Sequence, residues 1–243
     1  MEKNMKRKRE FGEGIIFTIS NYIWWFLLAN LYFWILNIPL IIVTCSMVIS
    51  VDYNINLLLI LSLLPLGPAL TALFSVMGKL TREGDVNVTK DFLKAYKVNF
   101  FESLFFWIFE LGIILILWTE IKFVNGNGSL YYLGIIPRLM LFICMILTFY
   151  IFPILSRFHL KKKDVLKLSI LYLFKKIYFG IFYVGAIFVL WFTLSKTSGV
   201  LIILFFVSII GYFIMFLEKG MLQEIEEDIE AGNKLVQSKI NEN

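Results

Sequence analysis

Two charged residues inside long apolar segments are the side chains of this sequence most able to do chemistry. Glu110 lies near the middle of segment 101–121, and Arg138 lies inside segment 130–155, about two helical turns from its start. A charge exposed to lipid is costly, so each side chain should face other helices or reach a partner. A short loop joins the two segments, which favours antiparallel neighbours and an ion pair between Glu110 and Arg138. Two alternatives stay open: Arg138 extends to the outer interface beside a protonated Glu110, or both residues line a path for a substrate or for protons.

Three polar residues in segment 22–50 form a second candidate site. Asn30, Asn37 and Thr44 recur every seven residues, which places them on one face of a helix. Such a stripe can join helices through hydrogen bonds or line a polar cavity, and we favour the first interpretation.

A third candidate is the sequence Pro65-Leu66-Gly67-Pro68, which interrupts segment 55–77. Proline lacks an amide proton and clashes with the preceding turn, so we predict a broken or kinked helix here. The carbonyl groups that lose their partners must then be satisfied by protein or water. Broken helices mark binding sites in transporters, but the second half of the chain has no convincing matching break.

Catalytic and metal-binding patterns are missing from the sequence. The chain has one histidine, His159, whereas a zinc peptidase motif needs a His-Glu-x-x-His pair. Cys45 and Cys144 both lie in apolar segments without metal-ligand spacing. We therefore predict no enzyme activity, no cofactor and no metal. The net charge of +5 does not indicate nucleic acid, because the basic residues are spread between apolar segments.

The elements that must position these residues are membrane-spanning helices. The chain is 59% apolar and 17% charged, with a mean hydropathy of +0.80, whereas a soluble domain is about a quarter charged. Six segments exceed the roughly 18 residues that cross a bilayer as a helix. They are residues 22–50, 55–77, 101–121, 130–155, 177–195 and 199–217.

We predict an all-α polytopic membrane protein with one helical domain over residues 1–217 and a short tail at 218–243, either helical or frayed. Segment 22–50 is long and should tilt, kink at Pro39, or extend beyond the membrane interface.

The Lys and Arg residues predict the orientation of these segments. Twenty of the 23 lie in the N-terminal segment, two loops and the C-terminal tail on one side, while the opposite side carries Lys122 and Lys196. Because basic residues are retained inside, we expect a multi-pass protein of the plasma membrane with both termini in the cytoplasm.

The two basic loops are expected to be short amphipathic helices at the cytoplasmic surface. Over 87–100 and 161–176, apolar and aromatic residues recur at helical spacing opposite lysines, a pattern that favours contact with anionic lipid headgroups. The alternative is that each simply continues a membrane-spanning helix into water. The candidate interface residues are Lys90, Lys94, Lys97, Arg157, Lys163 and Lys167.

Three blocks of sequence resemble the YesL-like family of polytopic membrane proteins from Gram-positive bacteria, a family of unknown function. They are LPLGPALTALF at 64–74, DFLKAYKVNF at 91–100 and FYIFPILSRF at 149–158. His159 stands where the family pattern has an aspartate, which argues against a specific role for this histidine. The resemblance carries over no catalytic or binding residues.

The resemblance implies an accessory role, because members of this family commonly accompany carbohydrate ABC importers and two-component sensor systems. We expect a non-enzymatic auxiliary protein whose partners are ABC-type sugar permease subunits or a sensor histidine kinase. One alternative is a small-solute transporter that uses Glu110 and Arg138. Another is a structural or lipid-binding protein whose lysines hold anionic headgroups.

Overall fold

A computed structural model describes residues 14–51, 55–126, 132–197 and 199–241, and these residues are helical almost throughout, with no strand. The helices are α1 (Ile15–Leu36), α2 (Ile38–Ser50), α3 (Leu57–Leu63), α4 (Leu66–Glu83), α5 (Val88–Gly126), α6 (Ile135–Arg157), α7 (Lys162–Lys175), α8 (Ile177–Thr197) and α9 (Gly199–Asn241). The predicted all-α fold class is confirmed. The basic N-terminal segment and the glycine-rich part of the loop after α5 lie outside the described residues.

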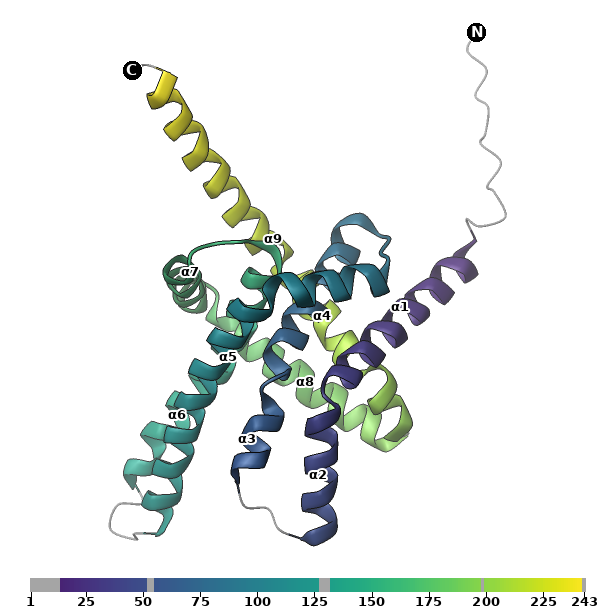
Figure 1. Cartoon of the computed structure of the whole chain (residues 1–243), viewed down its shortest axis with the longest axis vertical. Coiled ribbons are helices and arrows are strands. Elements are labelled where there is room, and N and C mark those ends of the chain that lie inside the picture. Colours follow the sequence, from purple (N-terminus) through teal and green to yellow (C-terminus); the bar gives the residue numbers. More distant parts are fainter. Residues whose placement is uncertain (1–13, 52–54, 127–131, 198, 242–243) are drawn as a thin grey trace.

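Five helical segments of the described chain are long and apolar enough to cross a membrane. They are Phe17–Leu36, Leu57–Glu83, Val88–Gly126, Tyr132–Arg157 and Leu204–Ala231. Helices α7 and α8 together would make a sixth, although they meet at an angle of 83°. The protein is therefore a multi-pass membrane protein. Figure 1 shows that α1 begins and α9 ends on the same side of the molecule, while α2 and α5 end on the opposite side.

The kink predicted for segment 22–50 is present as a break at Asn37, two residues before Pro39, and it divides the segment into α1 and α2. The side-chain amide of Asn37 donates to the carbonyl oxygen of Phe33 at 2.8 Å, a local bond that competes with regular helix geometry. Pro39 then lies in the first turn of α2, where a missing amide proton leaves no hydrogen bond unmade. Figure 1 shows α1 running obliquely and α2 continuing toward the far end.

The first predicted amphipathic helix, over 87–100, is part of α5 and not a separate element. Helix α5 has 39 residues and would be about 58 Å long if straight, far more than the roughly 30 Å of a hydrocarbon core. In Figure 1 its first turns run across the molecule before the helix descends beside α6. The second predicted helix does exist separately, as α7.

Helix α4 lies at the centre of the bundle, in contact with α1, α5, α6 and α9. Its buried face includes the small residues Ala69, Ala72 and Gly78, which allow neighbouring backbones to approach closely. The left-handed conformation of Gly84, with φ of 72°, ends the helix. The C-terminal segment from residue 218 continues α9 without interruption as far as Asn241, so it takes the helical alternative.

Candidate functional site

Glu110 is a buried carboxylate on α5, in the interior of the bundle. It is 2% exposed, and Thr148 of α6 donates a hydrogen bond to its Oε1 atom. Its Oε2 atom is buried without a hydrogen-bond partner in the described part of the chain. Cys144 lies one turn before Thr148 on α6 and is also buried. Glu110 thus faces the bundle interior, as its sequence position predicts.

Arg138 does not form the predicted ion pair with Glu110. Its guanidinium donates to the side chain of Asn125 at 2.5 Å, near the end of α5 that lies away from the basic face. Asn125 and Glu110 are 15 residues apart, which is about 22 Å along an α-helix. The side chain of Arg138 is exposed at that end, and this position agrees with the alternative in which it extends to an interface.

A second buried carboxylate, Glu218 on α9, was missed by the sequence analysis, which placed it in the polar tail. Glu218 is 1% exposed, and the hydroxyl of Tyr183 on α8 donates to its Oε1 atom at 3.2 Å. Nearby, the hydroxyl of Tyr150 donates to the carbonyl oxygen of Lys176 at 2.6 Å. The sequence does carry a signal for its burial: Glu218 precedes the apolar residues Met221 and Ile225 by three and seven positions, which places all three on one face of a helix.

The stripe of Asn30, Asn37 and Thr44 is divided by the break at Asn37. Asn30 and Asn37 are buried, whereas Thr44 is exposed and donates to the carbonyl oxygen of Leu40 on its own helix. Asn30 and Thr44 both line a groove of about 370 Å³ whose other lining residues are apolar. The polar residues therefore do not build a polar cavity.

The predicted break at Pro65, Gly67 and Pro68 is present, and protein atoms satisfy a freed carbonyl. Helix α3 ends at Leu63 and α4 begins at Leu66. The indole Nε1 of Trp107 on α5 donates to the carbonyl oxygen of Leu63 at 2.8 Å. Gly67 and Pro68 are both buried at this junction, so the break is a packed structural feature of the bundle.

Ion pairs join the basic end of the bundle to the extended part of α9. Arg157, at the end of α6, pairs with Glu226. Lys175 pairs with Glu224, and Lys176 lies 3.6 Å from the same carboxylate. These contacts hold α9 against the ends of α6 and α7.

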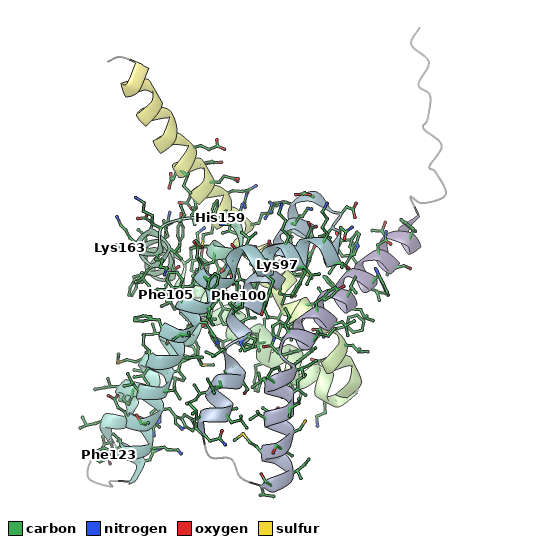
Figure 2. All side chains as sticks on the ribbon, viewed as in Figure 1. Lys97, Phe100, Phe105, Phe123, His159 and Lys163 are labelled. Atoms are coloured by element: carbon green, nitrogen blue, oxygen red, sulfur yellow. The ribbon has the colours of Figure 1, made fainter. Side chains whose placement is uncertain are left out.

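The remaining basic candidates stay on the surface of the same end. Five lysines are exposed there: Lys90, Lys94, Lys97, Lys163 and Lys167. Figure 2 shows Lys97, His159 and Lys163 at one end of the molecule and Phe123 at the other. The ammonium group of Lys162 lies 3.7 Å from the ring centroid of Phe105, a cation–π contact between α7 and α5. The structure thus gathers the lysines of both loops at one face.

Comparisons with known proteins agree with the sequence blocks. Residues 17–121 match the family described as "Protein of unknown function, DUF624". The chain is also 29% identical over 195 residues to a protein of Bacillus subtilis (strain 168) named "Uncharacterized protein YteU", covering 75% of this chain and 85% of the relative. No solved structure matches this chain significantly.

Proposed function

We propose that this chain, which belongs to the YesL-like (DUF624) family of membrane proteins, is a non-enzymatic auxiliary protein that docks on another membrane protein. The observation that carries this proposal is the form of α9. One helix runs from the membrane-spanning region past the basic face, and Figure 1 shows its last turns projecting away from the bundle. A projecting helix that is fixed at its base is suited to contacting a partner.

The base of this projecting helix is fixed by apolar and ionic contacts. Met221, Leu222 and Ile225 are each 1% exposed and belong to the hydrophobic core. The ion pairs to Glu224 and Glu226 lie on the neighbouring turns. Since both kinds of contact act together, the helix should keep one direction relative to the bundle.

Several acidic side chains of α9 are exposed just beyond the ion pairs. Glu227, Asp228 and Glu230 are exposed, and none of them has an ion pair within 4 Å among the described residues. A partner surface with Lys or Arg would complement them and would gain in association rate and specificity from that complementarity. The partner that the family resemblance favours is an ABC-type sugar permease subunit or a sensor histidine kinase.

The orientation that goes with this proposal places the basic face in the cytoplasm of a bacterial plasma membrane. The supporting observation is the distribution of Lys and Arg along the sequence, because 20 of 23 fall in the N-terminal segment, the two basic loops and the C-terminal tail. The exposed lysines would then also contact anionic headgroups of the inner leaflet.

Affinity purification from native membranes after mild cross-linking tests the proposal. We expect the full chain to recover permease or kinase subunits in a fixed ratio. Reversing the charges of Glu227, Asp228 and Glu230 to lysine should abolish this recovery, whereas the control Lys122→Glu, at the opposite end, should not. Recovery of this chain alone, as a monomer or homo-oligomer, would contradict the proposal.

A second candidate function, transport of a small solute, is supported by one observation only. Glu110 is buried and has one carboxylate oxygen without a partner in the described residues, an arrangement that ion and proton pathways use. Uptake into proteoliposomes that Glu110→Gln abolishes would support transport. Uptake that is unchanged in this variant would exclude a mechanism through Glu110.

A further inference from the structure

A polar cleft of about 260 Å³ opens at the basic face, between α4, α5 and the end of α6. Its lining includes none of the residues in the ion pairs that hold α9, and neither of the buried carboxylates Glu110 and Glu218. Three cationic side chains line it: Lys79 and Arg82 on α4, and Lys94 on α5. The cleft therefore concentrates positive charge in a concave site instead of spreading it over a surface.

The carboxylate in the lining does not balance this charge. Asp91 pairs with Lys79 at 2.8 Å, and Glu83 lies 3.9 Å from the same ammonium group. Neither Arg82 nor Lys94 has an ion pair within 4 Å in the part of the chain that the structure describes. The side chains of Arg82 and Lys94 are therefore available to bind an anionic ligand.

The guanidinium of Arg82 lies close to the helix that carries it. Its Nη1 atom lies 3.3 Å from the position that a Cβ atom on Gly78 would occupy. The absence of a side chain at Gly78 lets the guanidinium fold back along α4. A planar guanidinium that is positioned in this way can bind two oxygens of a phosphate group at once.

The side-chain amide of Asn99, at the cleft, has a buried oxygen that lacks a hydrogen-bond donor. Asn99 lines the cleft and is 5% exposed, and its Oδ1 atom has no hydrogen-bond partner among the described residues. An unsatisfied buried acceptor is costly, because it has lost its water without gaining a partner. A ligand hydroxyl beside the anionic group would satisfy it.

One edge of the cleft is apolar and faces outward. Val98 lines this edge and is 54% exposed, and Phe101, three residues further along α5, is 81% exposed. Exposed apolar residues beside a cationic cleft are the arrangement expected where acyl chains end and headgroups begin. The cleft is therefore open to a ligand from the bilayer as well as from solution.

We propose that this cleft binds a phosphate ester that carries hydroxyl groups. The phosphate lies between Arg82 and Lys94, and a hydroxyl of the ligand donates to Asn99 Oδ1. Two sources share this chemistry: the headgroup of a phospholipid such as phosphatidylglycerol, and a soluble phosphorylated polyol such as glycerol 1-phosphate. This site does not depend on the protein partner proposed above.

Native mass spectrometry of the full chain, released from a non-ionic detergent, tests the proposal in two arms. The first arm offers equimolar phosphatidylglycerol and phosphatidylcholine, and the second offers glycerol 1-phosphate alone. We expect one bound ligand per chain in at least one arm. Arg82→Gln should weaken that binding about tenfold or more, as the loss of a charge-assisted hydrogen bond does. Lys97→Gln is the matched control, since Lys97 is exposed on α5 and is absent from the cleft lining.

Asn99→Leu is a second variant that keeps the number and branching of the side-chain heavy atoms, and it should also weaken binding. Thermal unfolding by circular dichroism checks that each variant is folded. A preference for phosphatidylglycerol that Arg82→Gln removes supports the lipid source, and binding of glycerol 1-phosphate that Arg82→Gln removes supports the soluble source. Binding that is absent in both arms, or that falls equally in Arg82→Gln and Lys97→Gln, overturns the proposal.

Discussion

Trp107 on α5 lies directly against Gly67 on α4, and its indole also donates to the carbonyl oxygen of Leu63 on α3. A Cβ atom on Gly67 would lie 2.4 Å from the Cβ atom of Trp107, while the hydrogen bond to Leu63 is 2.8 Å long. One side chain therefore packs on the restart of the broken helix and satisfies the carbonyl at its end. This relationship makes the proline-containing break a stable part of the fold.

Gly67→Ala should destabilise the protein by about 1–3 kcal/mol, because the added methyl group forces α4 and α5 apart. The matched control is Gly112→Ala on α5, where no atom lies within 4 Å of the added Cβ. Alanine is the better helix former, so the control should be neutral or slightly stabilising. Thermal unfolding in detergent micelles, followed by circular dichroism, measures both variants. Equal effects at the two glycines would contradict the close packing of Trp107 on Gly67.

Trp107→Phe should also destabilise the protein, by about 1–3 kcal/mol, since it leaves the carbonyl of Leu63 without its partner inside the bundle. Trp118→Phe on the same helix is the control, because Trp118 is 42% exposed. The comparison uses the same unfolding measurement. A Trp107→Phe variant as stable as the Trp118→Phe variant would show that water or another group satisfies this carbonyl.

Thr148→Val should destabilise the protein by about 1–3 kcal/mol, because it removes the hydroxyl that donates to Glu110 and leaves both carboxylate oxygens without a partner. Thr119→Val is matched to it: Thr119 is exposed and donates only to the carbonyl of Ile116 on its own helix. Adding Glu110→Leu to Thr148→Val should restore much of the loss, since no polar group is then left unsatisfied. Failure of this rescue would mean that Thr148 acts by packing alone.

Tyr183→Phe should lower stability because Glu218, which is 1% exposed, loses its one donor among the described residues. A loss of about 1–3 kcal/mol is expected. Tyr178→Phe is the control, as Tyr178 is 58% exposed on the same helix. Thermal unfolding curves measure the loss of stability in both variants. A loss at Tyr178→Phe as large as that at Tyr183→Phe, or larger, would refute the role of the Tyr183 hydroxyl.

Arg157 and Glu226 should show a coupling energy of about 0.5–1 kcal/mol in a double-mutant cycle with glutamine substitutions. The Arg157 side chain is 11% exposed and that of Glu226 is 48% exposed, so solvent screens this pair only in part. The coupling should shrink as salt is added. A parallel cycle between Arg157 and Glu227 should give no coupling, and equal values in the two cycles would exclude a specific pair.

Much of the fold could be predicted from local sequence. Apolar segments long enough to cross a bilayer identify most of the helices. The closely spaced Pro65 and Pro68 identify the break between α3 and α4, whereas the single Pro153 lies inside the continuous helix α6. Pro39 likewise indicates a kink close to the break at Asn37. Local sequence does not reveal the side-chain hydrogen bond from Asn37 to Phe33, because an Asn can make that bond or leave it unmade without any change in the sequence pattern.

The candidate site was less predictable than the fold. Sequence reasoning identified Glu110 as a residue that must be buried, but it assigned Arg138 as its partner in place of Thr148. It placed Glu218 in a polar tail, because the acidic residues that follow it dominate the local composition. The cleft of Lys79, Arg82, Lys94 and Asn99 was not recognised, since its residues come from two helices and their neighbours are ordinary loop lysines.

The sequence by itself determined that this chain is helical, that it resides in a membrane, and that the lysines of its two basic loops lie at one end. These properties follow from composition and periodicity, which act on each segment separately. The tertiary structure alone decided which polar groups are in contact. It pairs Glu110 with Thr148 and Glu218 with Tyr183, and it places Arg82 in the lining of an open cleft. These contacts depend on the depth and rotation of each helix, which are set by the packing of the helices around α4.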